Sequence, residues 1–389
     1  MVVRIAMVSS TGYVPPPSPE RTSHPFLTYD MIHDIPNTIQ KTLEISSNQS
    51  GQIYETLRER SEFYYTGCGT AFFSAMLGAS ILSLTESAQF KYECVQALEL
   101  SNYHFPVSRA SVTFGVSHSG ITKTTLDALS SAKAQGSYCV GITHFPNSPI
   151  TKVADETFVV GNGPDKSRCH TKCYLAGATA LAYIGLELLE QRKAARSAHV
   201  QGIRKSLSEL PQMASKVLSS TEQSMKEVAE KQAGKRTIYF AGTGASYPNA
   251  LEAALKVMES SYLPAQGFET EQLLHGPWVS LDSESVVFVM ATEGRTYGRS
   301  MDLVKAATSL GSTVIPIVNE DDHEMASISK NVVYIPPVDE HLAPYLSIIP
   351  LYLFAYYMCL QRGNNPDYIH YLTPAYWNAR QIIFPPGTH

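Results

Sequence analysis

The sequence predicts an α/β protein built from two tandem units, each a doubly wound parallel sheet flanked by helices. Strand-like segments alternate with longer helical segments, and this alternation is typical of a parallel sheet covered on both faces. The order of the segments then repeats in the second half of the chain, with a glycine-rich loop after the first strand of each half. The chain has 389 residues, which is enough for two domains of about 150 residues each.

An extended arm is expected at the N-terminus, because residues 1–25 are rich in Pro, Ser and Thr. A helical stretch follows over 27–60. The strands expected in the first half are 63–66, 112–116, 138–143 and 158–160, and the helices between them are 70–82 and 122–135. A helical region over 171–230, polar in its middle, leads to the second half.

The second half repeats this order. Its expected strands are 237–241, 286–291, 313–318 and 332–335, and its expected helices are 246–262, 297–310 and a long final helix. The GCGT and SHSG loops of the first half correspond to GTGAS and ATEG in the second, which indicates an internal repeat. We therefore expect an N-terminal arm and helix (1–45), a first domain (46–205) and a second domain with a C-terminal tail (206–389).

Composition and charge argue against several classes of protein. Hydrophobic residues make up 44% of the chain and charged residues 17%, as in an ordinary globular protein, and the net charge is −5. No basic stripe is visible, so neither nucleic acid nor a membrane is expected as a partner. The apolar run over 345–360 contains Pro350 and is short for a membrane span, so a buried helix is expected. No signal peptide is evident, and a cytoplasmic location is expected.

The six cysteines form neither a disulfide framework nor paired CxxC metal ligands, which suits a reducing compartment. Cys169, His170 and Cys173 are the one cluster, and no second ligand pair of matching spacing follows them. We interpret this cluster as a helix start that carries thiols, and we expect no metal.

The segment SHSGITKTT lies between an expected strand and an expected helix. Hydroxyl groups of Ser117, Ser119 and Thr122 flank a glycine there, and a helix N-terminus offers unpaired N–H groups and a favourable dipole to an anion. Helix capping alone would need one such residue. We therefore interpret the loop as a phosphate site. The GCGT loop at 67–70 is less specific, since it could be a structural turn, but it lies at the end of the sheet where ligands bind.

Reactive candidates lie in the segment YPNALEAALKVMESSY of the second half. Glu252, Lys256 and Glu259 are spaced i, i+4 and i+7, so they share one face of a helix. A solvated charged stripe would be the ordinary interpretation, but the rest of this helix is apolar or small, which indicates packing. His275 follows in LLHGPW. A packed carboxylate beside a lysine, with a histidine nearby, suits proton transfer next to a carbonyl group.

Four segments together, GCGT, VSHSGITKTT, GTGASYPNALEAALKVMESSY and ETEQLLHGPWVSLD, resemble the sugar isomerase (SIS) domain family. The likeness covers roughly residues 28–373. It is greatest to the isomerase half of glucosamine-6-phosphate synthase and to stand-alone glucosamine-6-phosphate deaminases and fructosamine-6-phosphate deglycases. The resemblance implies two tandem SIS domains, a phosphorylated sugar as the ligand, and a reaction that needs no cofactor.

The resemblance also implies a role for each motif. Residues of the two loops of the first half would bind the sugar and its phosphate: Cys68, Gly69, Thr70, Ser117, His118, Ser119 and Thr122. Glu259 would carry a proton between C1 and C2, with Glu252 and Lys256 beside it. His275 would help to open the sugar ring and would come from a neighbouring subunit, which implies a homodimer with shared active sites.

Three positions depart from the family pattern. Ala71 stands where a serine often follows the first loop, and His118 replaces a glutamine. Pro374 stands where many members carry a lysine that can form a Schiff base with the open-chain sugar.

Three functions are compatible with these residues. We favour an isomerising deaminase that converts glucosamine 6-phosphate to fructose 6-phosphate and ammonia. A fructosamine-6-phosphate deglycase or a simple aldose–ketose isomerase is the second possibility. A non-catalytic sugar-phosphate sensor is the third, and it is disfavoured because Glu252, Lys256, Glu259 and His275 are all present.

Overall fold

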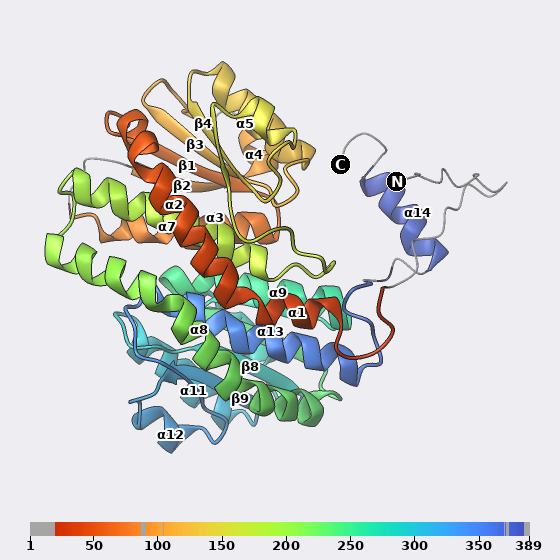
Figure 1. Cartoon of the computed structure of the whole chain (residues 1–389). Helices are drawn as coiled ribbons and strands as arrows, with labels where there is room; N and C mark the ends of the chain where they lie inside the picture. The colour runs from red at the N-terminus through yellow and green to blue at the C-terminus, as the bar shows by residue number, and fades with distance from the viewer. Residues whose placement is uncertain (1–19, 87–90, 104, 369, 371–372, 385–389) are drawn as a thin grey trace.

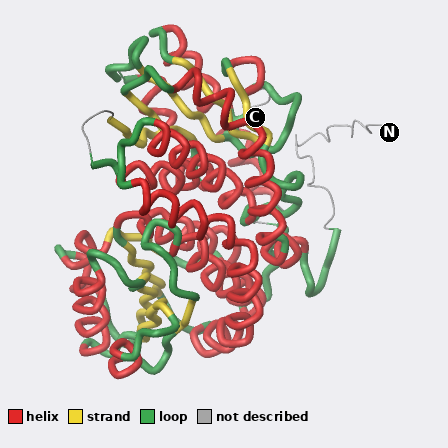
Figure 2. The backbone as a smooth tube through the Cα atoms, turned by 60° about the vertical axis from the view of Figure 1, so that its left-hand side comes forward, coloured by secondary structure: helices red, strands yellow, loops and turns green. Residues whose placement is uncertain are grey.

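The computed structural model describes residues 20–86, 91–103, 105–368, 370 and 373–384. Two α/β lobes lie one above the other, with long helices between them (Figure 1). The strands gather in two separate parts of the molecule, and helices fill the region between these parts (Figure 2). Residues 1–19 of the predicted N-terminal arm lie outside the described residues.

The first lobe contains a sheet of five parallel strands. They are β1 (Glu62–Gly67), β2 (Lys91–Gln96), β3 (Ser111–Val116), β4 (Tyr138–Thr143) and β5 (Glu156–Val159). Their order is β2–β1–β3–β4–β5. The central strands β1, β3 and β4 are buried along almost their whole length, as expected of a sheet covered by helices on both faces.

The second lobe repeats this sheet. Its strands are β6 (Thr237–Gly242), β7 (Ala265–Glu269), β8 (Ser285–Met290), β9 (Thr313–Asn319) and β10 (Val333–Ile335). They are parallel in the order β10–β9–β8–β6–β7, so that β6 to β10 occupy the places of β1 to β5. The predicted fold class, two repeated parallel sheets flanked by helices, is confirmed.

The helices cover these sheets and join the lobes. Those of the first half are α1 (Leu27–His33), α2 (Ile35–Leu57), α3 (Thr70–Ala79), α4 (Ala97–Asn102), α5 (Lys123–Ala134), α6 (Ile150–Val153) and α7 (Lys172–Gln191), with the 3-10 helix η1 (Ser80–Leu84). Those of the second half are α8 (Ser197–Gln232), α9 (Tyr247–Ser261), α10 (Thr270–Leu274), α11 (Tyr297–Ser309), α12 (Glu324–Ile328), α13 (Ala343–Gln361) and α14 (Pro374–Ile383), with η2 (Gly244–Ser246) and η3 (Pro277–Ser280).

The helices α7 and α13 form the centre of the molecule. α7 packs against α2 and α3, and α13 packs against α8 and α9. Both are long and apolar enough to cross a membrane, but 83% of the apolar stretch of α7 and 94% of that of α13 are buried inside the protein. Burial of this extent is that of core helices, and the predicted buried helix over 345–360 is confirmed.

Two features of the fold differ from the sequence prediction. β2 and β7 were not expected, because these edge strands are largely exposed or half-buried and lack the apolar pattern of the central strands. The long helix α8 contains Pro211 and contacts both α2 and α13. The domain boundary expected after residue 205 lies inside α8, so this helix joins the two lobes without a break.

Candidate active site

A cavity of about 530 Å³ opens near the carboxyl ends of β1, β3 and β4, which is where ligands bind in parallel α/β sheets. Loops of the first lobe and α9 of the second lobe both line it. The predicted site residues that line the cavity are Cys68, Gly69, Thr70, His118, Ser119, Thr122, Lys256 and Glu259. Ser117, Glu252 and His275 are not among the described residues that line it.

The three charged residues of α9 share one side of the helix but differ in environment. Glu252 is 0% exposed and Lys256 is 2% exposed, whereas the side chain of Glu259 is 26% exposed and reaches the cavity. The Lys256 Nζ lies 2.8 Å from Glu259 Oε2 and 3.5 Å from Glu252 Oε1. These residues therefore form a buried charge cluster and not a solvated stripe, and Glu259 is the carboxylate that a ligand can reach.

A threonine of the first lobe completes this charge cluster. Thr70, the first residue of α3, donates its hydroxyl proton to Glu252 Oε2 at 2.9 Å and accepts a hydrogen bond from Lys256 Nζ at 2.9 Å. The hydroxyl of Tyr352, on α13, donates to Glu252 Oε1 at 3.0 Å. The network thus joins the two lobes at the wall of the cavity, and it explains why the GCGT loop ends in a hydroxyl residue.

Burial and charge act against each other in this network. Burial raises the pKa of Glu252 to about 7, although Lys256 acts to lower it. Burial alone would lower the pKa of Lys256, but the carboxylates of Glu252 and Glu259 raise it well above its usual value. Lys256 is therefore a cation at neutral pH, compensated by two acids in a medium of low polarity.

The SHSG loop presents its hydroxyl groups unevenly. Ser117 is buried, and its hydroxyl donates to Thr122 Oγ1 at 3.1 Å and accepts from the Gly120 N–H at 3.1 Å. Ser119 and Thr122 line the cavity. Thr122 precedes α5 but makes no side-chain capping bond within the described chain. The first N–H groups of α5 are therefore open to an anion in the cavity.

Glycine is required at position 120. Its φ is +67°, in the left-handed region, and a Cβ atom there would collide with the hydroxyl of Ser148. The loop can therefore fold close against the segment that follows β4.

His275 does not line the cavity that contains the phosphate loop and Glu259. It follows α10, its side chain is 68% exposed, and its Nδ1 lies 2.9 Å from the Glu271 carbonyl oxygen. Glu271 in turn forms an ion pair with Arg299. His275 therefore does not lie at the charge cluster of its own chain. That a neighbouring subunit supplies this histidine stays a prediction.

The cavity also contains residues that the sequence analysis did not place there. Those with titratable side chains are His144, Asp165, Arg168 and His170. His144 directly follows β4, so its position at a strand end was a usable signal. The other three lie between β5 and α7; His170 belongs to the cysteine cluster, whereas no motif marks Asp165 or Arg168. Ala71 also lines the cavity, and Pro374 begins α14, which has no buried residue.

The cysteine cluster of the sequence analysis is divided in space. The Cys169 thiol donates to Glu259 Oε2 at 3.5 Å, next to the charge cluster. Cys173 lies instead beside the histidines of the cavity wall. Two overlapping sets have the side-chain chemistry of metal ligands, His118–His144–Cys173 and Asp165–His170–Cys173.

The second lobe has a smaller cavity of about 240 Å³ at the GTGAS and ATEG loops. Its lining includes Thr243 and Arg295 but also the carboxylates of Glu293 and Glu340. Hydroxyl groups of Ser246, Thr292 and Thr296 line it too, but the two carboxylates would repel an anion, so this cavity is less suited to a phosphate.

Comparison with known families identifies the repeat. A family model for the SIS domain matches residues 56–182 and 233–362, one match in each lobe. The chain belongs to the SIS domain family. The two SIS matches correspond to the two sheets and their helices.

Curated proteins similar to this chain include glutamine–fructose-6-phosphate aminotransferases (isomerizing). The chain is 26% identical over 356 residues to the glutamine–fructose-6-phosphate aminotransferase (isomerizing) of Thermococcus kodakarensis, covering 90% of this chain and 57% of that protein. It is 30% identical over 315 residues to the enzyme of the same name from Chlorobaculum tepidum, covering 80% of this chain and 50% of that protein. The chain thus spans about half the length of the curated relatives it matches.

Solved structures share the two-SIS fold. The C-terminal domain of glucosamine-fructose-6-phosphate aminotransferase from Francisella tularensis superimposes with a TM-score of 0.82 at 20% identity, covering 89% of this chain and 98% of that one. Glucosamine-6-phosphate deaminase from Thermotoga maritima superimposes with a TM-score of 0.70 at 20% identity, covering 90% and 98%.

The substitution Lys256→Met tests the charge cluster. It leaves the buried Glu252 and the half-buried Glu259 without their cation, so we expect the free energy of unfolding to fall by about 3–5 kcal/mol at neutral pH. Lys123→Met, at an exposed ion pair with Asp127, is the control and should change stability by less than about 1 kcal/mol. Urea denaturation monitored by circular dichroism measures both.

The same variant should show a definite pH dependence. Because folding raises the pKa of Glu252, ionisation of this carboxyl group destabilises the folded protein as pH rises from the unfolded-state pKa toward 7. Lys256 opposes that destabilisation, so the loss in Lys256→Met should be larger at pH 8 than at pH 5. An equal loss at both values would contradict the coupling.

Proposed function

We propose that this chain is a phosphosugar isomerase that acts on an amino-sugar 6-phosphate, converting glucosamine 6-phosphate and water to fructose 6-phosphate and ammonia. One observation carries the proposal. The Glu259 carboxylate, held 2.8 Å from the buried cation of Lys256, lines the same cavity as the hydroxyl-rich start of α5. A base and an anion site in one cavity are what a phosphosugar isomerase needs. The names of the relatives support this reaction class.

The phosphate group would bind at the start of α5. Ser119 and Thr122 supply hydroxyl donors, and the first N–H groups of the helix supply backbone donors. Arg168, also in the lining, adds a guanidinium group of the kind that pairs with phosphate. Anchored there, the open chain of the sugar would extend across the cavity toward α9.

Proton transfer would then run between C2 and C1. Glu259 takes the C2 proton, the C1=C2 double bond forms, and O1 gains a proton to give an enolamine. Glu259 returns its proton to C1, while the nitrogen loses one proton and the C2=N bond forms. Lys256, next to Glu259 and the cavity, stabilises the negative charge that develops at O1. The result is a C2 imine of fructose 6-phosphate.

Hydrolysis of this imine completes the reaction. Water adds to C2, the C–N bond breaks, and ammonia leaves with the C2 ketone formed. A Schiff base to the protein is not favoured, because Lys256 is the one lysine among the described residues that line the cavity, and it is held protonated between two acids. The imine nitrogen is therefore the substrate's own.

A fructosamine-6-phosphate deglycase is the second candidate. Its specific support is Pro374, which begins an α14 helix without buried residues where many family members carry a lysine. A deglycase would use the same base and the same phosphate site, and it would release an amino acid or other amine in place of ammonia.

We also propose that the protein acts as a homodimer. The exposed His275, away from the cavity of its own chain, would enter the cavity of the partner and help to open the sugar ring. No nucleic acid or membrane is part of this proposal, and the protein would act in the cytoplasm.

The phosphate site is tested by the double substitution Ser119→Ala, Thr122→Ala. Loss of two hydroxyl donors should raise the KM for glucosamine 6-phosphate by roughly 10-fold or more, since each hydrogen bond to a charged group contributes about 1.5–3 kcal/mol. Thr124→Ala with Ser130→Ala, on the same helix but outside the cavity lining, is the matched control. Steady-state kinetics with an unchanged KM for the first pair would exclude this loop as the phosphate site.

The base is tested by Glu259→Gln, which keeps size and hydrogen bonding. The kcat for ammonia release from glucosamine 6-phosphate should fall by about 10²–10⁴-fold, and solvent deuterium should enter C1 of the product with the wild type but not with the variant. Glu293→Gln, the same change in the smaller cavity, should have wild-type activity. Release of amine from a fructosamine 6-phosphate, without ammonia from the amino sugar, would favour the deglycase instead.

Shared active sites are tested by mixing two inactive proteins, Glu259→Gln and His275→Ala. A hybrid dimer would hold one intact site, so random exchange should restore about one quarter of wild-type activity. Native mass spectrometry verifies the exchange. Complete exchange without recovery of activity would show that His275 does not act across an interface.

A further inference from the structure

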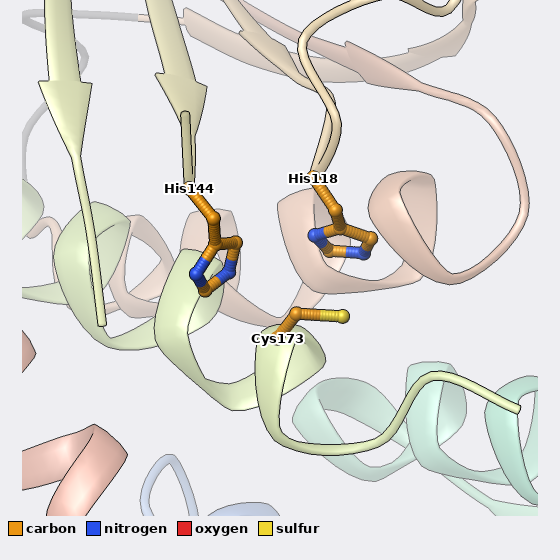
Figure 3. Close-up of side chains that lie close together, drawn as sticks. All are labelled: His118, His144 and Cys173. Atoms are coloured by element: carbon orange, nitrogen blue, oxygen red, sulfur yellow. The ribbon is translucent and has the colours of Figure 1, made fainter. Parts of the chain in front are cut away.

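Three side chains from separate segments converge below the phosphate loop. His118 follows β3, His144 follows β4, and Cys173 is the second residue of α7. The possible ligand atoms of these three residues all lie within 4.8 Å of one another. Figure 3 shows the two imidazole rings descending side by side toward the thiol of Cys173.

Three of the four histidine nitrogens in this group lack partners in the described part of the chain. Among the residues that the structure describes, His118 Nε2 and both ring nitrogens of His144 are buried and accept or donate no hydrogen bond of normal geometry. His144 is 5% exposed and Cys173 is 0% exposed. Buried polar groups without partners are rare and costly, which points to a ligand that the protein chain itself does not supply.

The side-chain types suit a metal cation as that ligand. Imidazole binds a transition metal through a nitrogen lone pair of its neutral form. A thiol binds as the thiolate, so binding at Cys173 would release one proton to the solvent.

We propose that His118, His144 and Cys173 form a binding site for a zinc-class transition metal ion, with a fourth coordination position that faces the cavity. Imidazole nitrogen and thiolate sulfur are the ligands that zinc and similar transition metals take, and three protein ligands leave one position of a tetrahedral zinc ion open. Ligand atoms around a tetrahedral zinc ion lie about 3.5 Å apart, so small rotations of these side chains would close the site. His118 and His144 line the cavity and Cys173 does not, which directs the open position toward the cavity.

The surroundings favour one orientation of His144. A Cβ atom placed on Gly161 would lie 3.0 Å from His144 Nδ1, so this edge of the ring faces the backbone of the segment after β5. Nε2 is therefore the nitrogen that would bind the metal. Nδ1 makes no hydrogen bond of normal geometry to a described residue, but it lies on the side of the backbone, where a histidine ligand commonly has its second contact.

The alternative ligand set is weaker. Asp165 shares Cys173 with His170, but its carboxylate already accepts bonds from the Ser167 N–H and hydroxyl and from the Thr171 N–H. It is therefore better suited to hold the loop than to bind the metal directly. The proposed ion does not depend on the isomerase activity proposed above, and it would place positive charge beside Ser119 at the phosphate loop.

The test uses the full chain, freed of metal with a chelator and then titrated with Zn²⁺ and Co²⁺. We expect one equivalent of each to bind, measured by calorimetry and by metal analysis after dialysis, and we expect the Co²⁺ form to show a thiolate-to-cobalt charge-transfer band. Less than a stoichiometric equivalent bound, or a Co²⁺ spectrum without this band, would overturn the proposal without any variant.

Two substitutions assign the ligands. Cys173→Ser should abolish the charge-transfer band and, like His144→Gln, weaken Zn²⁺ binding by at least about 10-fold. Cys359→Ser, at an equally buried cysteine on α13, should change neither the band nor the affinity. Retention of both in Cys173→Ser would also overturn the proposal. Ammonia release by the metal-free protein is a separate readout, so a failed metal titration would leave the isomerase proposal standing.

Discussion

The protonated amine of Lys256, buried between Glu252 and Glu259 at the junction of the two lobes, is the interaction on which the rest of the site depends. Removing a lysine from water is strongly unfavourable unless opposite charges and hydrogen-bond acceptors replace the solvent. Here two carboxylates and the hydroxyl of Thr70 do so. Because Thr70 belongs to the first lobe, the solvation of one charge fixes α3 against α9.

The two carboxylates of this network have different tasks. Glu252 is fully buried and holds Lys256 from behind, with Thr70 and Tyr352 saturating its oxygens. Glu259 forms an ion pair with Lys256 and also lines the cavity. A base with its orientation fixed by a neighbouring cation is preorganised for proton transfer, and this arrangement favours Glu259 over Glu252 as the residue that meets the sugar.

Duplication of the fold explains the position of the cavity, and divergence of the two copies explains why its two sides differ in chemistry. Both sheets have the same strand order and place glycine-rich loops at their carboxyl ends. The first copy keeps a hydroxyl-rich loop before α5, whereas the second has Glu293 at the corresponding loop. The second copy contributes α9 instead, so the larger cavity draws its proposed anion site from one lobe and its proposed base from the other.

Much of this arrangement follows from the sequence, and the remainder depends on packing. The central strands and both loops were predictable because they are apolar runs followed by glycine motifs. The edge strands β2 and β7 were not, since partial exposure removes the apolar pattern. Their spacing in the sequence placed Glu252 and Glu259 on one face of the helix, but it could not tell which of the two carboxylates reaches the cavity.

The proposed metal ligands show the same limit of sequence-based prediction. Cys169 and Cys173 are close in the sequence, yet one thiol contacts Glu259 and the other lies beside His118 and His144. These two histidines end different strands, 26 positions apart in the sequence. Only the parallel order of β3 and β4 brings them together, and no local pattern contains that information.

A crystal structure with the reduced open-chain analogue 2-amino-2-deoxyglucitol 6-phosphate, which cannot isomerise, would show whether the phosphate loop and Glu259 bind one sugar together. We expect its phosphate against Ser119, Thr122 and the start of α5, with C1 and C2 within about 3.5 Å of the Glu259 carboxylate. An analogue bound in the second-lobe cavity, or bound at the SHSG loop with C1 and C2 out of reach of Glu259, would contradict this expectation.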